Sequence, residues 1–464
     1  MRADSLQYSA LQICSACDAE MASGNGATVF TGISTDSRDI KDGDLFVPLK
    51  GDNFNGFDYV IPALQAGAGG SLIDSGFSQE LSNDISDRVL IRVQDTLRSL
   101  TDLASTHRKL FPIPLVAVTG SSGKTTVREM IASILSRKYR TLATKGNLNN
   151  LIGLPMTILT ISPECEAAVV EAGINRIGEM DMLARAAAPN VGVISTIGPV
   201  HLEGLKNIAT VASEKFRLVM AASDTGVIPF GVPELEALRE RFSGKLFTFG
   251  IDRGDFRASN ISMGDRIRFL MESPWGSREI TILHPGKHNI ANALAASAAC
   301  LSIGSSLDDV ATALVETAPP AWRMEFVQFG ADRILIRDYY NANPQSMRAA
   351  LETLADINGN HSKIAILGDM KELGAESYSL HHDIGRLAAS LKIDRLIFIG
   401  ESGRAFADGF FYAKGASGVL SLFDDRDSAW EVIRSEIGAY DRILVKASRA
   451  MKMELLAGRI LEEI

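Results

Sequence analysis

The chain has 464 residues, of which 46% are hydrophobic and 22% charged, and this composition is typical of a globular protein with more than one domain. A net charge of −9 argues against a protein that binds nucleic acid through a basic face, although a single site can still be positive. Four cysteines are too few for a disulfide framework. The sequence shows no signal peptide and no apolar run of roughly 20 residues. We therefore expect a soluble cytoplasmic protein without membrane insertion.

The first 110 residues combine short strand-like runs with turns rich in Gly, Asp and Asn. Strands are predicted at residues 46–49 and 89–93, and a loop at residues 51–56. The sequence Phe-Pro-Ile-Pro at residues 111–114 interrupts any helix. It therefore predicts a boundary after a first domain of residues 1–110.

Beyond this boundary, apolar runs alternate with helical patterns, which predicts a parallel sheet. Strands are expected at residues 115–119, 167–171 and 191–196, and a helix with one apolar stripe at residues 125–137. The sequence Ala-Pro-Pro at residues 318–320 predicts a second boundary. The central domain is therefore expected to cover residues 111–318.

The last third of the chain repeats the alternation of strands and helices. Its four predicted strands lie at residues 334–338, 364–367, 395–399 and 442–445. This pattern predicts a second α/β unit over residues 319–464. The expected fold class is therefore α/β with three domains.

A phosphate-binding loop is predicted between the first central strand and the helix that follows it. Its glycines let backbone N–H groups face phosphate oxygens, and the helix N-terminus favours negative charge. Lys124 can neutralise the β- and γ-phosphates, and the Thr125 hydroxyl can bind Mg²⁺. The glycines are only three residues apart, unlike those of the common G-x-x-x-x-G-K-[ST] loop, and a plain Gly/Ser turn with a solvated lysine is the alternative. The residues expected to bind ATP here are Gly120, Ser121, Ser122, Gly123, Lys124, Thr125 and Thr126.

This short loop resembles the ATP-binding loop of the Mur ligases, which join amino acids or peptides to a carboxylate. Glu171, His201 and Lys215 follow it in the order of the family's metal site. The resemblance implies that these residues and Lys124 are catalytic, and that Thr125, Glu171 and His201 bind Mg²⁺. It also implies that Lys215 is carbamylated, which turns a cation into an anion that can hold a second Mg²⁺. Taken singly, each residue has an ordinary alternative, such as an exposed glutamate, a packed histidine or a solvated lysine.

Four further residues resemble family positions that contact the nucleotide. Asn289 and Asn292 lie in the sequence Gly-Lys-His-Asn-Ile-Ala-Asn-Ala at residues 286–293, and their spacing places both on one helical face. Asn289 could also cap that helix. Arg323 and Asp338 match residues that reach ATP from the third domain, although a surface ion pair and a turn are the alternatives. Such an arrangement implies that the third domain closes over the central one.

Several segments resemble the family member that adds D-alanyl-D-alanine to UDP-N-acetylmuramoyl-tripeptide. They lie at residues 145–153, 338–343 and 368–374, the last followed by His381, whose role the sequence does not indicate. Residues 36–38 and 43–51 resemble the family's uridine-sugar domain. The substrate contacts implied by these segments are Ser37, Arg38, Lys50, Asn147, Asn149, Asn150, Asn341 and Asn343.

The resemblance thus implies a UDP-sugar domain, a central ATPase domain and a Rossmann-like domain that binds the dipeptide. It implies ATP and Mg²⁺ as cofactors, and a monomer that binds no nucleic acid. The chain departs from the family pattern at Asn55-Gly56-Phe57, at Arg176 and at Lys446-Ala447-Ser448-Arg449. None of these departures touches the predicted ATP or metal positions.

Three other functions remain open at this point. The chain could be a Mur-type ligase for another acceptor, either diaminopimelate- or lysine-adding or of the folylpolyglutamate type. It could also be a nucleotide-driven switch with the same loop, or an inactive binding protein derived from a ligase. A redox or zinc role for Cys14 and Cys17 is not expected, because no second cysteine pair follows and their surroundings have a helical pattern.

Overall fold

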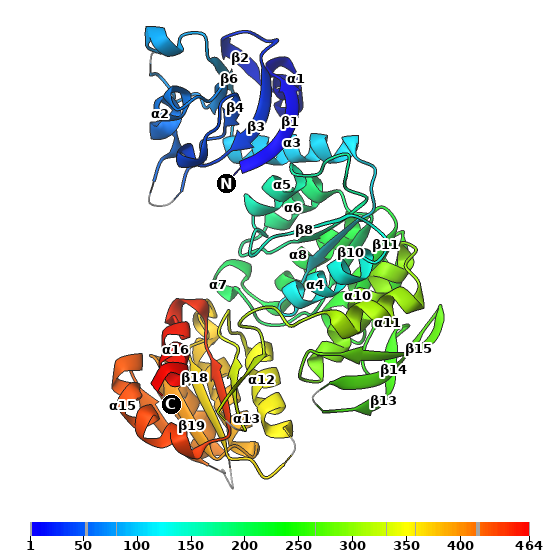
Figure 1. Ribbon diagram of the computed structural model, residues 1–464, viewed down its shortest axis with the longest axis vertical. Coiled ribbons are helices and arrows are strands. Elements are labelled where there is room, and N and C mark those ends of the chain that lie inside the picture. The colour runs from blue at the N-terminus through cyan, green and yellow to red at the C-terminus, as the bar shows by residue number, and fades with distance from the viewer. Residues whose placement is uncertain are drawn as a thin grey trace.

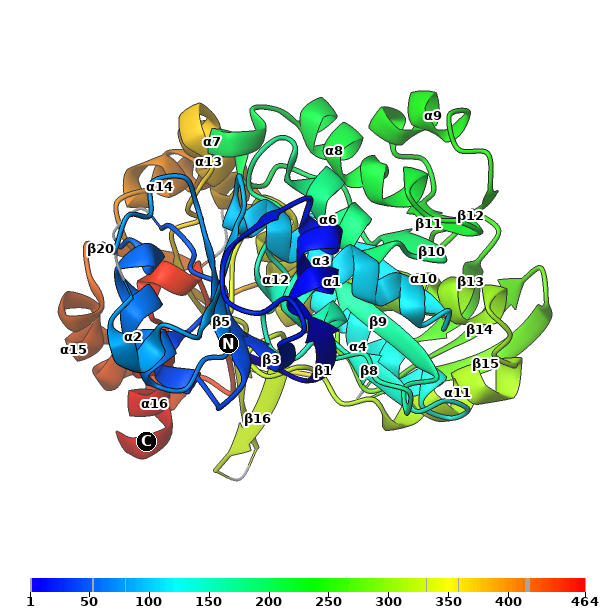
Figure 2. The same ribbon diagram turned by 90° about the horizontal axis from the view of Figure 1, so that it is seen from above.

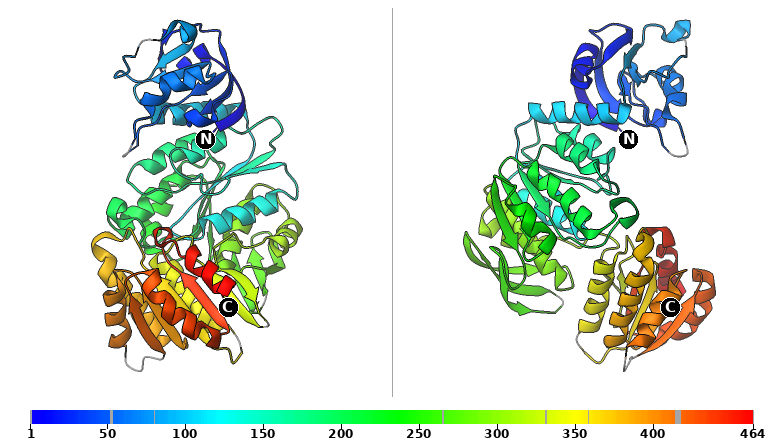
Figure 3. Two further views of the ribbon diagram at one scale, coloured as in Figure 1. Left: turned by 60° about the vertical axis from the view of Figure 1, so that its left-hand side comes forward. Right: turned by 180° about the vertical axis from the view of Figure 1, so that it is seen from behind.

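The computed structural model describes residues 2–463 except residues 52–53, 80, 265, 331, 358 and 414–417. Within this part of the chain, three six-stranded sheets and one three-stranded sheet follow one another in sequence. Figure 1 shows them along an arc, with the first sheet at the top, the central sheets on the right and the last sheet at the lower left. The two further views in Figure 3 show the same arc. None of the described helices is long and apolar enough to cross a membrane.

The first sheet has the strand order β1-β3-β4-β5-β6-β2, in which β3 to β6 run parallel and the two edge strands run antiparallel to their neighbours. The predicted strand at residues 89–93 is confirmed as β6. The strand predicted at residues 46–49 is wrong for most of its length, because β4 ends at Phe46 and Pro48 has no N–H for a strand ladder. The predicted loop at residues 51–56 includes residues 52–53, which lie outside the described residues. The elements are β1 (Arg2–Ser9), α1 (Ala10–Cys17), β2 (Glu20–Ser23), β3 (Val29–Ser34), β4 (Asp44–Phe46), α2 (Val60–Gln65), β5 (Gly70–Ile73) and β6 (Val89–Arg92).

Helix α3 (Thr96–Leu110) connects the first sheet to the central part of the chain. It begins at the N-cap Asp95 and packs against α5 (Gly153–Ile158) and α6 (Glu179–Ala187). One hydrophobic cluster therefore continues from Ile13 and Phe30, through Leu100 on α3, to Leu154 and Leu183. Figure 1 shows α3 between the two parts, and in the view from above in Figure 2 the helices α1, α3 and α6, which contact one another through α3, overlap. This shared apolar core fixes the first part on the central one.

The central sheet is entirely parallel, in the order β12-β11-β10-β7-β9-β8. The strands predicted at residues 115–119 and 167–171 are confirmed with those bounds, and the strand predicted at residues 191–196 ends at Ile194. The helix predicted at residues 125–137 is confirmed as α4, one residue earlier at its start. The strands are β7 (Leu115–Thr119), β8 (Thr141–Ala143), β9 (Ala167–Glu171), β10 (Val191–Ile194), β11 (Thr225–Pro229) and β12 (Lys245–Phe249). The helices beside them are α4 (Lys124–Leu135), α7 (Leu202–Leu205), α8 (Ile208–Met220) and α9 (Pro233–Arg239).

A three-stranded antiparallel sheet follows, which the sequence analysis did not predict. Its strands are β13 (Arg257–Ser262), β14 (Ile267–Ser273) and β15 (Gly276–Ile282). Ile267, Phe269 and Met271 alternate along β14 and are buried against α10 (His288–Ser302) and α11 (Leu307–Glu316). This packing gives the first turn of α10 a fixed position beside the central sheet.

The last sheet has the order β16-β17-β21-β18-β19-β20, with only the edge strand β16 antiparallel among the described pairs. All four predicted strands are confirmed within one residue at each end. Because β21 enters between β17 and β18, the strand order changes direction there, and ligands commonly bind beyond the carboxyl ends of such strands. The elements are β16 (Glu325–Phe329), β17 (Arg333–Arg337), α12 (Pro344–Asp356), β18 (Lys363–Gly368), α13 (Ser377–Ser390), β19 (Arg395–Ile399), α14 (Gly403–Tyr412), β20 (Val419–Phe423), α15 (Arg426–Glu436), β21 (Arg442–Lys446) and α16 (Glu454–Glu463).

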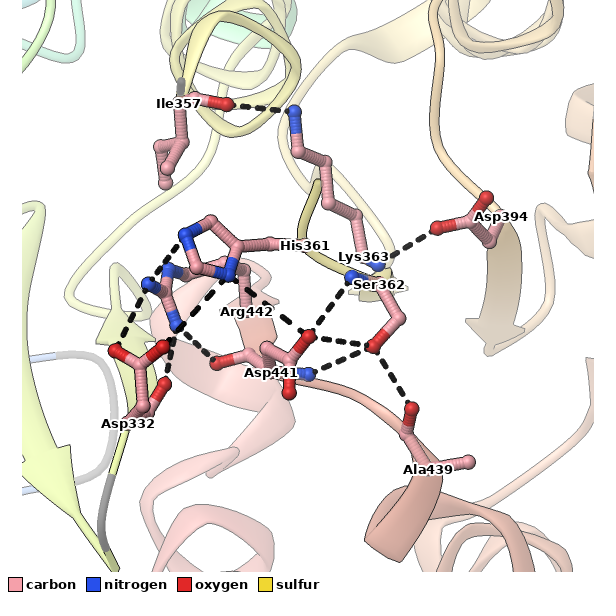
Figure 4. Close-up of polar contacts among 9 residues, drawn as sticks. All are labelled: Asp332, Ile357, His361, Ser362, Lys363, Asp394, Ala439, Asp441 and Arg442. Carbon is pink, nitrogen blue, oxygen red and sulfur yellow. Dashed lines mark hydrogen bonds and ion pairs between the residues drawn. The ribbon is translucent and has the colours of Figure 1, made fainter. Parts of the chain in front are cut away.

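At the other end of this sheet, a polar network joins the amino ends of the central strands β18 and β21, as Figure 4 shows. The Arg442 guanidinium donates to the Asp332 carbonyl oxygen at 2.5 Å and to Nε2 of His361 at 2.9 Å. The Asp441 carboxylate accepts from the backbone N–H and the hydroxyl of Ser362, both at 3.0 Å. These bonds tie the first residues of β18 and β21 together.

Candidate active site

The predicted phosphate loop lies between β7 and α4, and its backbone requires both glycines. Gly120 and Gly123 have φ of 150° and 79°. A Cβ on Gly123 would lie 2.6 Å from Oδ1 of Asn292, and one on Gly120 would lie 2.0 Å from Oγ of Ser195. Only glycine fits such positions, because L side chains rarely adopt this backbone conformation and the space is filled.

The serines of this loop are fixed by the segment that follows β10. The Ser121 hydroxyl donates to the Gly198 carbonyl oxygen at 2.9 Å, and the Ser122 N–H donates to the Thr196 hydroxyl at 2.9 Å. Lys124 donates from Nζ to the Gly120 carbonyl oxygen at 2.9 Å. The loop therefore has one defined shape before any ligand is present.

Glu171, at the carboxyl end of β9, is buried and held at both carboxylate oxygens. Oε2 accepts from the Thr125 hydroxyl at 2.9 Å, and Oε1 accepts from the side-chain amide of Asn149 at 2.8 Å. The Arg128 guanidinium lies 3.9 Å from Oε2. A carboxylate beside a threonine hydroxyl is an all-oxygen arrangement, which Mg²⁺ prefers, so these residues fit the predicted ion.

Lys215, on α8, is only 1% exposed. Its amine makes no hydrogen bond or ion pair with the described residues. Burial holds the pKa of Lys215 well below its ordinary value, Lys124 lowers it further, and Glu171 opposes the shift. An uncharged amine is the form that can react with carbon dioxide to give a carbamate, so the surroundings of Lys215 fit the predicted modification.

Lys124 stands beside the same groups. Burial lowers the pKa of Lys124, Glu171 raises it, and Arg323 from the last part of the chain lowers it again. Lys124 at the phosphate loop therefore experiences the charge of a cation from the last part of the chain as well as that of one buried carboxylate. Such a field favours a polyphosphate ligand.

His201 makes a contact that the sequence did not predict. It has a left-handed backbone with φ of 49°, and its Nδ1 bonds to Oε2 of Glu372 in the last part of the chain. Among the described residues, no group of three or more His, Cys, Asp or Glu side chains is placed to hold a metal. The predicted metal ligands include only two residues of those types, Glu171 and His201.

The two predicted asparagines of α10 are both buried and are bonded to each other. The Asn292 amide donates to Oδ1 of Asn289 at 2.8 Å, and the Asn289 amide donates to the Pro285 carbonyl oxygen at 2.7 Å. Asn289 does not cap the helix, because α10 begins at His288 after Lys287. Through Asn292 this turn contacts the phosphate loop.

In the last part of the chain, Arg323 and Asp338, the two residues expected to reach ATP, each contact neighbouring side chains. The Arg323 guanidinium lies over the ring of Tyr340, 4.1 Å from its centre. Asp338 is buried, which raises its pKa, while Lys446 and Arg323 oppose that rise. The Lys446 amine donates to Oδ2 of Asp338 at 2.7 Å and to the Asn341 carbonyl oxygen at 3.2 Å. Sequence reasoning missed Lys446, although it begins the segment noted as a departure.

The last part of the chain is docked on the phosphate loop by polar contacts. The Asn343 amide, beside its capping role on α12, donates to the Ser121 carbonyl oxygen at 3.1 Å. The Gln345 amide donates to the Ile197 carbonyl oxygen at 2.5 Å. A hydrogen-bonding amide gives no signal in a sequence, so Gln345 was also missed.

The remaining predicted substrate residues are spread over all three parts of the chain. Asn150 accepts the N–H groups of Ile152 and Gly153 and so starts α5, and Asn147 is exposed. Asn341 accepts the N–H of the next residue. Ser37, Arg38 and Lys50 lie in the first part of the chain, where the Arg38 guanidinium pairs with the Asp36 carboxylate and the backbones of Lys50 and Asn55 form a β-bridge.

His381 has a clear position that the sequence left open. Its Nε2 accepts the Met370 N–H at 3.0 Å, and Nδ1 bonds to the Ser377 carbonyl oxygen at 2.7 Å. Nδ1 must donate to that carbonyl, so the ring is neutral, in keeping with the burial that lowers the pKa of His381. The histidine therefore fixes the backbone of the segment after β18.

Known proteins resemble the chain over nearly its whole length. The family description "Mur ligase middle domain" matches residues 118–300, and "Mur ligase, glutamate ligase domain" matches residues 322–449. The UDP-N-acetylmuramoyl-tripeptide–D-alanyl-D-alanine ligase of Escherichia coli (strain K12) is 36% identical over 91% of this chain and 92% of that protein.

Two solved structures share the whole arrangement. A crystal structure of MurF from Acinetobacter baumannii has a TM-score of 0.88 and 31% identity, covering 98% of this chain and 99% of that one. MurF ligase from Thermotoga maritima in complex with ADP has a TM-score of 0.82 and 25% identity, covering 93% and 97%. Together with the phosphate loop and the buried residues around it, these matches show that the chain belongs to the Mur ligase family.

Proposed function

We propose that the chain is an ATP-dependent, ADP-forming ligase that joins D-alanyl-D-alanine to UDP-N-acetylmuramoyl-tripeptide in peptidoglycan precursor synthesis. The observation that carries the proposal is the phosphate loop at Lys124, whose amine interacts electrostatically with Glu171 and Arg323, together with the buried Lys215, whose pKa is held well below its ordinary value. The relatives named above support the substrate pair. We place the reaction in the cytoplasm and assign it to a monomer.

Each part of the chain takes one ligand in this proposal. Residues 1–110 bind the uridine sugar through Ser37, Arg38 and Lys50, and residues 111–318 bind ATP. Residues 319–464 form the Rossmann-like domain for the dipeptide. Further contacts to the substrates come from Asn147, Asn149, Asn150, Asn341 and Asn343. The base and ribose of ATP are assigned to Asn289 and Asn292, and a further contact with the nucleotide is assigned to Asp338.

The chemistry follows from the poor reactivity of a carboxylate toward an amine. Transfer of the γ-phosphoryl group to the tripeptide carboxylate releases ADP and gives an acyl phosphate. The dipeptide amine then attacks the acyl carbon, and the tetrahedral species collapses with loss of phosphate and a proton. Lys124 and Arg323 offset the negative charge where the carboxylate and the triphosphate meet, so positioning and electrostatics supply most of the rate.

The proposed Mg²⁺ ligands are Thr125, Glu171, His201 and the carbamate of Lys215. Bound Mg²⁺ would neutralise phosphate oxygens during phosphoryl transfer. The protein's own contribution is to hold these ligands before the ion arrives. Asn149 fixes one oxygen of Glu171, and burial lowers the pKa of the Lys215 amine.

Phosphate release from Mg²⁺-ATP tests the proposal against its alternatives. Release should require both UDP-N-acetylmuramoyl-tripeptide and D-alanyl-D-alanine, and Lys124→Ala should abolish it. Release with diaminopimelate, lysine or glutamate as the only effective acceptor would point to another ligase of the family. Release without any acceptor would point to a nucleotide switch and refute the proposal.

A further inference from the structure

The segment after β18 is anchored at three successive residues and then projects one carboxylate toward the central domain. Asp369 accepts the N–H groups of Glu401 and Ser402 at 3.2 and 3.0 Å. Met370 donates its N–H to His381, and the Lys371 N–H donates to the Ser448 hydroxyl at 2.9 Å. These bonds come from the loop after β19, from α13 and from the segment after β21. The position of the next residue, Glu372, is therefore set by the fold.

Glu372 is held in a conformation that costs free energy. Its φ of 65° lies in the left-handed region, which residues other than glycine rarely adopt and which persists where the surroundings impose it. The carboxylate reaches His201, which also has a left-handed backbone and begins α7 beyond β10. Gly374 approaches Glu203 beside this contact. Two strained residues thus meet where the carboxyl ends of two parallel sheets face each other.

The place of this contact matches what the second half of the reaction needs. The carboxyl end of β18 borders the change in strand order where the last domain is expected to bind its ligand. His201 belongs to the proposed ATP and metal site of the central domain. An amine delivered from the first site to an acyl phosphate in the second must pass from the last domain to the central one, and Glu372 and His201 are in contact across this boundary.

The charge of Glu372 suits the incoming group. An α-amino group has a pKa of about 7.7–8.0, so the dipeptide arrives mainly as an ammonium ion near neutral pH. The Glu372 side chain is 55% exposed, so a ligand can reach it, whereas Asp369 is buried and engaged with backbone N–H groups. Lys371 lies against Asp369 and Glu401, at 2.8 and 3.1 Å, which keeps its cation off the Glu372 carboxylate.

We propose that Glu372 binds the α-ammonium group of the incoming dipeptide and places its nitrogen beside the acyl phosphate. The inference rests on the proposed ligase function. His381 acts as a positioning residue, because it holds the backbone of Met370 two residues before Glu372.

Hydroxylamine separates this inference from the function on which it rests. Hydroxylamine is a small uncharged nucleophile whose nitrogen attacks the acyl carbon of the acyl phosphate. The products are a hydroxamate and phosphate, and the attacking nitrogen loses one proton. It needs no ammonium site. The experiment compares hydroxamate formation from ATP and UDP-N-acetylmuramoyl-tripeptide with dipeptide addition, for the full chain and for Glu372→Gln.

Glu372→Gln should keep hydroxamate formation while kcat/KM for D-alanyl-D-alanine falls about 10- to 100-fold, mainly through KM, because a charged hydrogen bond is lost. Glu372→Asp should recover part of the loss. Glu376→Gln, which removes an exposed carboxylate four residues away, should change neither reaction. Equal loss of both reactions in Glu372→Gln, or no loss in either, would overturn the inference. Absence of hydroxamate with the unmodified chain would overturn the ligase proposal itself, and this inference with it.

Discussion

Replacement of Lys446 by Met tests the buried ion pair that supports the proposed nucleotide contact. Lys446 is 1% exposed, and its amine makes its shortest contact, 2.7 Å, with Asp338. Without the lysine, the Asp338 carboxylate must either stay charged in an apolar site or take up a proton. Breaking a buried pair costs about 3–5 kcal/mol. If Asp338 instead takes up a proton, the loss of stability is limited to the cost of protonating a carboxyl of ordinary pKa at pH 7, which is about 4 kcal/mol.

Thermal unfolding followed by calorimetry measures this cost. A loss of about 4 kcal/mol should lower the unfolding temperature of the last domain by roughly 10 °C, at about 2–4 °C per kcal/mol for domains of this size. Adding Asp338→Asn to Lys446→Met should recover at least half of the loss, because no charge then remains unpaired. Lys392→Met, at an exposed position, is the matched control. A loss under about 1 kcal/mol, or no recovery in the double variant, would refute the reasoning.

Three further changes probe other parts of the structure. Asn149→Ala should raise the Mg²⁺ concentration for half-maximal rate and lower kcat/KM about 10-fold or more, because the charged carboxylate of Glu171 loses a hydrogen bond. An unchanged Mg²⁺ titration would contradict this prediction. Burial lowers the pKa of His284 from 6.5 to about 4, so the unfolded chain binds more protons between these values and stability must fall as the pH falls through that window. By pH 4 the loss from this group is about 3 kcal/mol, and urea unfolding of His284→Gln should show a correspondingly flatter pH dependence, whereas parallel profiles would rule out His284 as the source. Arg442→Met should lower the free energy of unfolding in urea by about 2–3 kcal/mol, because the bonds to Asp332 and His361 are lost. A change within about 0.5 kcal/mol would mean that the network in Figure 4 does not stabilise the fold.

Local patterns predicted the elements that carry the phosphate site. The apolar run that ends at Glu171 gave β9 with its observed bounds, since a fully buried strand of a parallel sheet must be apolar throughout. The alternation of Ile267, Phe269 and Met271 along β14 is the pattern of a strand with one buried face, so this strand has a signal in the sequence. The strand expected at residues 46–49 ends at Phe46, because Pro48 has no N–H to donate to a neighbouring strand.

Contacts between distant segments could not be predicted from local patterns. Asn343 and Ser121 are 222 residues apart in the sequence, and Glu372 and His201 are 171 apart. Such pairs depend on how the last domain docks on the central one. The spacing of apolar residues, which repeats every two residues in a strand and every 3.6 in a helix, holds no information on that docking. Asn149 shows the same limit, because no local pattern predicts the hydrogen bond between its amide and Glu171.

The most direct test of the central claim is the mass of the product formed from ATP, UDP-N-acetylmuramoyl-tripeptide and D-alanyl-D-alanine. The account predicts one new species with the mass of both substrates less one water, formed together with one ADP per molecule and absent with Lys124→Ala. An unchanged UDP-N-acetylmuramoyl-tripeptide mass while ADP accumulates would contradict it, because ATP would then be hydrolysed without forming an amide.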